Sequence, residues 1–356
     1  MEIIAAQLAE TLREAAANKT PLRIAGGGTK DFYGNRASGE IFSTSAYRGI
    51  IDYEPTELVI TARAGTPLAE VEAALHEKGQ MLAFEPPHFS AGSTLGGCIA
   101  AGLSGPRRPY AGAVRDLVLG VRLLDGKGAD LRFGGQVMKN VAGYDVSRLM
   151  AGAMGTLGVI LEVSLKTLPL PAAEITLHQR HNEVDAIRLM NEWAGQPLPI
   201  SATAWTGGDL GIRLSGAPSA VEAARRKLGG DAIDATQAVR FWQGLRDHTD
   251  TYFTQGSTLW RLSVKPTTPA LTLPGTPMIE WNGSLRWIQT DASVEQVREA
   301  AAAAGGHATL FRCSGGNRSD NVFHPLSPAL AALHRNLKQA FDPAGILNPG
   351  RLYRGM

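Results

Sequence analysis

Glycine clustering is the feature that most constrains how this chain can fold. The sequence has 41 glycines among 356 residues, well above the ~7% of an average protein, and no Gly-X-Y period accompanies them. They gather at residues 26–28, 92–105, 126–135, 152–158 and 315–316. Glycine is used where a backbone turns sharply or approaches another group closely. The clusters therefore predict several loops whose main chain lies directly against a neighbouring segment or a ligand.

Composition and charge place the chain among ordinary globular proteins. Apolar residues make up 44% and charged residues 19%, which permits a large core and excludes global disorder. With 35 basic and 33 acidic residues, the net charge of +2 is too balanced for a protein dedicated to nucleic acids or membrane surfaces. Only Cys98 and Cys313 occur, which excludes a disulfide framework and favours a reducing compartment. Since neither a signal peptide nor a spanning segment is recognisable, we expect a cytoplasmic protein.

The first half of the sequence alternates helical and strand patterns. Ile4, Leu8 and Leu12 recur every four residues and predict an opening helix over 1–18. Residues 86–110 are rich in small residues and lack periodicity, which is typical of a functional segment inside a compact domain. The other elements expected here are strands over 21–25, 58–64, 81–84, 117–124, 131–133 and 159–168, a helix over 66–79 capped by Thr66, and a helix over 146–150.

Pro169-Leu170-Pro171 marks an expected domain boundary, because the pattern becomes simpler beyond it. The expected strands are 175–178, 200–205, 210–214, 259–264, 278–287 and 307–312, and the expected helices are 184–193, 219–228, 294–304 and 328–341. This order indicates an antiparallel sheet with helices on one side, an α+β layer architecture.

Two common nucleotide-binding motifs fail when tested on the glycine segments. The Rossmann pattern needs a glycine five residues after Gly26, where Asp31 stands. A phosphate-binding loop needs Ser or Thr after Gly126-Lys127, where Gly128 stands. What remains is a turn, Gly26-Gly27-Gly28-Thr29, directly after a strand. Its backbone N–H groups can form an anion-binding nest, and an ordinary tight turn is the alternative.

Two further segments point in the same direction. Residues 92–105 carry glycine or alanine at more than half of their positions, so a bulky ligand has room to lie against the backbone. Close helix packing by small residues is the alternative. Residues 139–145, followed by Gly155-Thr156-Leu157-Gly158-Val159-Ile160, end in a glycine turn that enters an apolar strand. Such a strand can present backbone polar groups to the edge of an adenine.

Arginine and tryptophan fall together on the expected strands of the second half. Arg261 or Arg286 is suited to binding a small carboxylate bidentately. Tryptophan and arginine are also preferred anchors of protein interfaces, and core packing is the plain alternative. Alternation along a strand over 281–287 places Arg286 on the face opposite Trp281 and Trp287, so we do not expect it to share a pocket with them.

The three glycine segments, in this order, resemble the FAD-binding domain of the para-cresol methylhydroxylase (PCMH) and vanillyl-alcohol oxidase type. The motifs that carry the resemblance are Ala25-Gly26-Gly27-Gly28-Thr29, Gly92-Ser93-Thr94-Leu95-Gly96-Gly97, Gly143-Tyr144-Asp145 and Gly155-Thr156-Leu157-Gly158-Val159-Ile160. Asp342-Pro343 and Ile346-Leu347-Asn348-Pro349-Gly350 resemble the segment that ends FAD-linked 2-hydroxy-acid oxidases. Over nearly its whole length, the chain is most similar to the FAD-binding subunits of bacterial glycolate oxidases.

The resemblance implies an α+β fold with two parts. A two-subdomain PCMH-type FAD-binding domain is expected over residues 1–170, completed by about 342–356. A smaller antiparallel-sheet cap domain, which serves the substrate or an interface, is expected over 171–341.

The resemblance also implies where FAD is held. The turn at 26–29 is expected to bind the pyrophosphate, 92–97 the pyrophosphate and ribityl chain, and 158–160 the adenine. Residues in 102–112 are expected nearer the flavin ring, with Asn348 returning toward the flavin from the C-terminus. The implied cofactor-binding residues are Ala25, Gly26, Gly27, Gly28, Thr29, Gly92, Ser93, Thr94, Leu95, Gly96, Gly97, Gly102, Gly105, Tyr110, Gly112, Gly158, Val159, Ile160 and Asn348.

The departures from the family pattern matter as well. Relatives with covalent flavin carry a histidine where this chain has Gly28-Thr29, so we expect non-covalent FAD. Metal-dependent relatives carry two closely spaced histidines, whereas His307 and His324 here stand seventeen residues apart, so we expect no metal site. No catalytic residue is assigned. Lys139 is considered as a cation beside the flavin's pyrimidine edge, with a solvated surface lysine as the alternative.

The resemblance implies a subunit that takes part in oxidising a 2-hydroxy acid, glycolate or D-lactate, to the 2-oxo acid. The implied partners are a metal-bearing flavoprotein subunit (D) and an iron–sulfur subunit (F), to which the flavin here passes electrons. Peripheral membrane association through that complex is an option. A free-standing FAD-dependent oxidoreductase and a non-catalytic subunit stabilised by FAD remain as alternatives.

Overall fold

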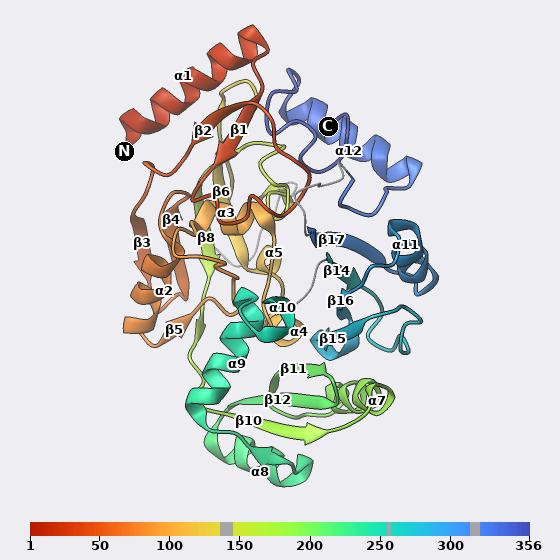
Figure 1. Ribbon diagram of the computed structural model, residues 1–356. Helices are drawn as coiled ribbons and strands as arrows, with labels where there is room; N and C mark the ends of the chain where they lie inside the picture. Colours follow the sequence, from red (N-terminus) through yellow and green to blue (C-terminus); the bar gives the residue numbers. More distant parts are fainter. Residues whose placement is uncertain (136–144, 255–257, 314–320) are drawn as a thin grey trace. The chain divides into compact units, whose positions relative to one another are not determined.

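The computed structural model describes residues 1–135, 145–254, 258–313 and 321–356. The chain divides into two compact units (Figure 1). Unit 1 comprises Met1–Leu103, Ala113–Pro169 and Ser319–Met356, and unit 2 comprises Ser104–Gly112 and Leu170–Arg318. Segment 104–112, expected within the FAD-binding domain, thus belongs to unit 2, and α12 (Pro328–Phe341), expected within the cap domain, belongs to unit 1. The roles assigned to the two domains stay predictions.

Unit 1 is built on a five-stranded antiparallel sheet. The strand order is β3 (Ile50–Glu54), β4 (Val59–Arg63), β8 (Val159–Lys166), β6 (Val118–Leu124) and β7 (Asp130–Gly134). The expected hairpin between β6 and β7 is confirmed. Asp125 stabilises its turn, because its carboxylate accepts the backbone N–H groups of Lys127 and Ala129, each at 2.9 Å.

A second, two-stranded sheet of unit 1 carries the first glycine turn. β1 (Leu22–Ala25) pairs in parallel with β2 (Glu40–Ser43), so the chain must cross over between them, and this crossover begins with the glycine turn. The opening helix is confirmed as α1 (Glu2–Asn18). It packs its small apolar face into a core that includes β1 and Leu347 of the C-terminal segment.

The remaining elements of unit 1 are short. They are α2 (Leu68–Glu77), β5 (Gln80–Met81), α3 (Leu95–Ala101), α5 (Val114–Leu117), α6 (Val146–Leu149) and β9 (Leu168–Pro169), besides α12. The strand expected over 81–84 is wrong, since only β5 forms and pairs with β9. Thr66 does not cap α2, which begins after Pro67; the Thr66 hydroxyl instead accepts the Gly49 N–H at 2.8 Å.

Unit 2 is built on an eight-stranded sheet whose neighbouring strands are antiparallel. The order is β13 (Asp231–Ala232), β10 (Ala173–Arg180), β12 (Asp209–Gly216), β11 (Ile200–Thr206), β15 (Thr276–Glu280), β16 (Leu285–Gln289), β14 (Thr258–Ser263) and β17 (His307–Cys313). The α+β fold class expected from the sequence is therefore confirmed.

Helices cover both faces of this sheet, so the expectation of helices on one side is wrong. α7 (Glu183–Ala194) and α8 (Pro218–Leu228) share a core with Leu177. α9 (Ala235–Asp247), which the sequence did not predict, meets the opposite face, because its Trp242 donates an indole N–H to Thr176 at 2.9 Å. Adjacent residues of a strand point to opposite faces. The other helices of this unit are α4 (Arg108–Ala111), α10 (Thr251–Thr254) and α11 (Val294–Ala303).

The strand expected over 278–287 is two strands joined by a reversal. β15 ends at Glu280, and a 3-10 turn over Trp281–Gly283 leads into the antiparallel β16. Trp281 and Asn282 have positive φ, 54° and 57°, which turns the chain back on itself. The alternation expected to relate Trp281 to Arg286 is therefore wrong, whereas Arg286 and Trp287 are consecutive residues of β16.

Candidate FAD-binding site

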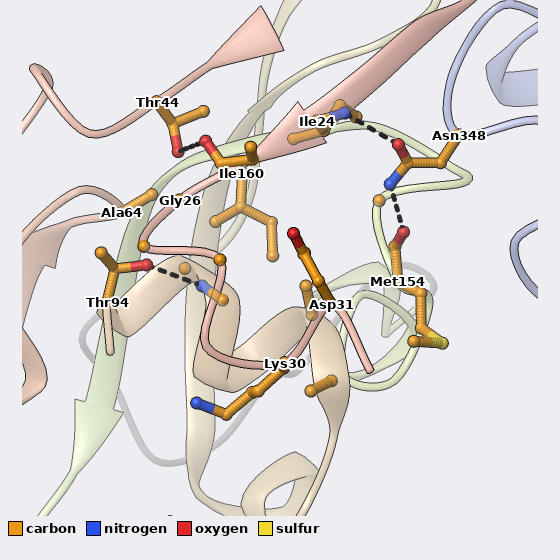
Figure 2. A pocket seen from close by; sticks show the side chains of 18 of the residues that line it. Ile24, Gly26, Lys30, Asp31, Thr44, Ala64, Thr94, Met154, Ile160 and Asn348 are labelled. Carbon is orange, nitrogen blue, oxygen red and sulfur yellow. Dashed lines mark hydrogen bonds between the residues drawn. The ribbon is translucent and has the colours of Figure 1, made fainter. Parts of the chain in front are cut away.

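A pocket opens in unit 1 at the carboxyl end of β1 (Figure 2). It contains about 810 Å³ of empty space, part of it open to solvent. Glycine and alanine backbone forms much of its wall. The lining comes from residues 23–31 with Ala37, Thr44 and Ala64, from Thr94, Gly96, Gly97, Ala100 and Ala101 at and in α3, from Met154, Gly155, Gly158 and Ile160, and from Asn348 and Arg351.

The first two glycine segments meet backbone to backbone. A Cβ at Gly27 would stand 1.5 Å from the carbonyl oxygen of Gly92, so no side chain fits there without separating the segments. α3 begins just beyond this contact, where the Thr94 hydroxyl caps it by accepting the Gly97 N–H at 3.3 Å. α3 thus lies inside residues 86–110, which lack hydrophobic periodicity. Its small residues allow close packing, so the helix forms without an apolar stripe.

Asn348 joins the C-terminal segment to the other wall of the pocket. Its side-chain oxygen accepts the Ile24 N–H at 2.8 Å, and its amide nitrogen donates to the Met154 carbonyl at 2.6 Å. Figure 2 shows both bonds flanking the pocket. A Cβ on Gly155 would lie 2.7 Å from this amide nitrogen, and Gly155 has φ +71°. A side chain at position 155 would therefore collide with the Asn348 amide, and only glycine leaves room for its hydrogen bonds.

The charges on the pocket wall favour an anionic ligand. Three lining residues are basic, namely Arg23, Lys30 and Arg351, against one acidic residue, Asp31. The whole chain, by contrast, is almost neutral at +2. Arg351 is 7% exposed, and its guanidinium donates to the carbonyl oxygens of residues 30, 31 and 35, which fastens the C-terminal segment to the loop after the glycine turn. Excess cations beside exposed glycine backbone suit phosphate groups.

Another part of the wall is apolar. Ile24, Ala64, Met154 and Ile160 contribute apolar side chains to the wall (Figure 2). An adenine or isoalloxazine ring is flat and largely apolar, so this part of the wall suits a ring while the glycine turn suits phosphates. Phosphate-compatible backbone, cation excess and apolar wall together fit a dinucleotide such as FAD.

Many of the residues implied by the family resemblance line this pocket together. They are Ala25, Gly26, Gly27, Gly28, Thr29, Thr94, Gly96, Gly97, Gly158, Ile160 and Asn348. Which part of FAD each one contacts stays a prediction.

The other implied residues lie elsewhere in the fold. Gly92 supports Gly27 from behind, and Ser93, Leu95 and Val159 are buried, at most 1% exposed. Gly102 ends α3.

The remaining three implied residues, Gly105, Tyr110 and Gly112, belong to unit 2. There the Gly105 carbonyl accepts the Trp281 indole N–H at 3.0 Å, and the Tyr110 hydroxyl donates to Asn282 at 2.9 Å. Burial raises the pKa of Tyr110 to about 12. Their predicted place beside the flavin ring stays a prediction.

Several lining residues were missed by sequence reasoning. Lys30 and Asp31 directly follow the glycine turn, so their position in the sequence was a usable signal. Gly155 stands in the glycine motif over 155–160 but was not assigned to the site, and Met154 and Arg351 reach the pocket only through long-range contacts that no local pattern reveals.

The structure does not describe two of the predicted features, and it bears on the expected lack of a metal site only over part of the chain. Lys139 and the motif at Gly143-Tyr144 lie outside the described residues. Within 1–135, 145–254, 258–313 and 321–356, no group of three or more His, Cys, Asp or Glu side chains is arranged to hold a metal ion.

The predicted relation of Arg286 to its tryptophans needs correction. Because the chain reverses at residues 281–283, strand alternation does not relate Arg286 to Trp281. Arg286 is 2% exposed and donates to the carbonyl oxygens of Gly283 and Thr268, both at 2.7 Å. It braces this turn, and burial lowers its pKa to about 10. Arg261, in contrast, lies 5.2 Å from the centre of the Trp281 ring.

Comparison with known proteins agrees with this geometry. Residues 5–134 match the family model described as FAD binding domain, and residues 277–352 match that of the C-terminal domain of FAD linked oxidases. The structure resembles that of alkyldihydroxyacetonephosphate synthase with a TM-score of 0.65 at 16% identity, covering 96% of this chain and 75% of that one. Fold, site and family models thus place the chain in the PCMH-type family of FAD-binding proteins.

Sequence similarity to individual proteins identifies the family more closely. Glycolate oxidase subunit GlcE of Escherichia coli (strain K12) is 48% identical over 346 residues, which span 97% of this chain and 96% of the relative. Glycolate oxidase subunit GlcD of Bacillus subtilis (strain 168) is 33% identical over 38% of this chain and 29% of its own length. This chain belongs to the GlcE family of FAD-binding glycolate oxidase subunits. The recognised family and the FAD cofactor are confirmed; the non-covalent attachment stays a prediction.

Among the described residues, no helix combines the length and apolar character that crossing a membrane requires.

Proposed function

We propose that this chain is the FAD-binding subunit of a complex that oxidises a small 2-hydroxy acid, glycolate or D-lactate, to the 2-oxo acid. The observation that carries the proposal is the pocket at the end of β1, with its glycine backbone, its three basic residues and its apolar wall. Similarity to GlcE over nearly the whole chain supports the choice of reaction.

The chain's own residues have defined tasks in this proposal. The turn at 26–29 and the segment around Gly96 and Gly97 bind the pyrophosphate through backbone N–H groups. Ile24 and Ile160 cover a ring and exclude water from it. Asn348 orients the C-terminal segment against β1. When bound, FAD supplies the redox chemistry, while the protein sets its position and surrounding polarity.

The proposal includes partners, because the chain has only two cysteines and an iron–sulfur cluster needs more ligands. We propose a metal-bearing flavoprotein subunit and an iron–sulfur subunit as those partners; the names of the relatives, glycolate oxidase subunits GlcE and GlcD, support a complex of several subunits. A cytoplasmic location and peripheral membrane association through the complex stay predictions.

The test is anaerobic reduction of the FAD-loaded chain, alone and in its complex, by glycolate and by D-lactate, followed by flavin absorbance. We expect reduction in the complex and copurification of the partner subunits. Full reduction of the isolated chain, with no partner copurifying, would instead establish a free-standing oxidoreductase. Full activity of a complex whose copy of this chain lacks FAD would establish a structural subunit.

A further inference from the structure

Helix α12 of unit 1 leaves much of its apolar face uncovered. Of its 14 side chains, all within the described residues, only Lys338 is buried, whereas Leu330 and Leu333 are 48% and 52% exposed. An amphipathic helix of a globular protein normally turns its apolar face to the core and its charged residues to water. Here the lysine is buried because it pairs with Asp342, and two leucines face solvent instead.

These leucines lead into a groove. Residues three, four and seven positions apart share one face of a helix, so Leu330, Leu333 and Leu337 form one apolar ridge. Leu337 also lines a groove with about 1270 Å³ of empty space, part of it open to solvent. The other apolar residues of the groove are Leu149, Leu157, Leu352 and Met356. We call ridge and groove together the α12 surface, and all of it belongs to unit 1.

The side chains around the α12 surface carry positive charge. Within residues 321–356, the one acidic side chain is Asp342, which is 1% exposed and paired with Lys338. The exposed charged residues of this segment are Arg335 and Arg354. Two further arginines line the groove, each beside a carboxylate that balances it, namely Arg115 with Asp116 and Arg148 with Asp145. A complementary surface is therefore apolar at its centre and acidic around it.

The concave shape favours a protein over a lipid surface as the occupant. A helix that binds a bilayer lies in the plane of the interface, so a membrane can cover the ridge but cannot fill the groove. A side chain that projects from a protein can enter the groove, as the buried anchors of protein interfaces do. Exposed apolar patches with a polar rim are also typical of protein–protein contact sites.

We propose that the α12 surface binds another subunit of the complex, through an apolar projection of that subunit surrounded by acidic side chains. This inference rests on the proposed function, since it concerns the partners of that complex. Leu330 and Leu333 supply the apolar contact, and the groove receives the projecting side chain. Arg335, two positions from Leu333, lies on a different side of α12, so it steers the acidic partner rather than contacting its apolar centre.

The first test measures how readily the purified complex dissociates on dilution, by mass photometry, with each variant coexpressed with the partner subunits. We expect Leu330→Asp and Leu333→Asp each to weaken assembly by about tenfold or more, because a carboxylate then lies in an apolar contact beside acidic side chains. The matched control is Gln339→Asp, which adds the same charge at an exposed position on the side of α12 opposite Leu330. It should stay within about threefold of wild type.

The second test identifies the chemistry of the occupant. A photo-crosslinking amino acid in place of Leu333 is activated in the intact complex, and the captured peptide is identified by mass spectrometry. We expect a peptide of another subunit that combines apolar residues with an excess of Asp and Glu. A peptide from a second copy of this chain, or one with an excess of Lys and Arg, would overturn the inference.

Three other results would also overturn it. They are assembly of both leucine variants within about threefold of wild type, an equal loss in Gln339→Asp, and cosedimentation of the wild-type chain, but not of Leu333→Asp, with anionic phospholipid vesicles. FAD content per chain and thermal unfolding separate weaker assembly from misfolding. Purification of the wild-type chain without any partner subunit would contradict the proposed function itself, which the other outcomes leave intact.

Discussion

At the scale of single residues, Gly27 is the position that tolerates least. Any Cβ there would collide with the backbone oxygen of Gly92, and an aspartate would add a negative charge to the proposed pyrophosphate site. We expect Gly27→Asp to abolish FAD binding and Gly27→Ala to weaken it by about tenfold or more, while unit 2 stays folded. Flavin absorbance per chain and circular dichroism measure the two effects.

Gly135→Ala is the matched control for Gly27, because nothing lies within 4 Å of a Cβ built at that position. It should keep full flavin occupancy. Full occupancy in Gly27→Asp as well would show that the phosphate assignment is wrong.

Asn348 is the second residue on which the pocket depends. It is 5% exposed and pairs with one backbone donor and one backbone acceptor. Asn348→Ala leaves both groups buried without that partner, so we expect a loss of about 2 kcal/mol or more in the free energy of unfolding of unit 1. FAD affinity should fall with it. Denaturant unfolding of the apoprotein checks the first effect; an unchanged midpoint would refute it.

At the scale of elements, a buried ion pair secures α12 to the C-terminal segment. Lys338 donates to Asp342 at 2.7 Å and to the carbonyls of Thr156 and Leu347 at 2.9 and 2.7 Å. Breaking a buried pair leaves an uncompensated charge. We therefore expect Lys338→Met or Asp342→Asn to lower the free energy of unfolding by about 3 kcal/mol, measured by urea denaturation. Exposed Lys227→Met should change it by less than about 0.5 kcal/mol.

The same lysine gives a prediction for pH. Burial lowers the pKa of Lys338 below its ordinary value, so the unfolded chain binds the proton more readily than the folded chain does. Stability rises with pH wherever the unfolded state binds more protons. The contribution of Lys338 should thus rise from its folded pKa up to about 10.4. Lys338→Met should lose this rise, and an identical alkaline profile in the variant would contradict the assignment.

Local sequence patterns predicted most helices and strands, but they failed where contacts between distant residues determine the structure. The hairpin of β6 and β7 followed from an Asp-Gly turn between apolar strands. The reversal between β15 and β16 was missed, although Asn282-Gly283 is itself a strong turn signal. α3 was missed because its small residues lack periodicity and its packing depends on contacts such as that of Gly96 with Ala64.

The lining of the pocket likewise divides into residues that a local pattern predicts and residues that only distant contacts bring there. Gly26 to Thr29 were predicted from a local turn, whereas Arg351 joins them from more than 300 residues away in the sequence.

At the scale of the whole molecule, we expect any metal chemistry to reside in a partner subunit. His307 begins β17 at an exposed position, and no described cluster in this chain resembles a metal site. We expect no stoichiometric Zn, Mn or Fe by elemental analysis. We also expect His307→Ala and His324→Ala to lower the activity of the complex by less than about tenfold. One metal per chain, or loss of activity of 10²-fold or more, would place the catalytic site in this subunit.

The central claim is that unit 1 holds one FAD without a covalent bond. The most direct measurement is reconstitution of the purified apoprotein with FAD, followed by acid precipitation and identification of the flavin in the supernatant. We expect one intact FAD per chain before precipitation and its complete recovery in the supernatant afterwards. A chain that binds no flavin at saturating FAD, or flavin that stays with the precipitated protein, would contradict it.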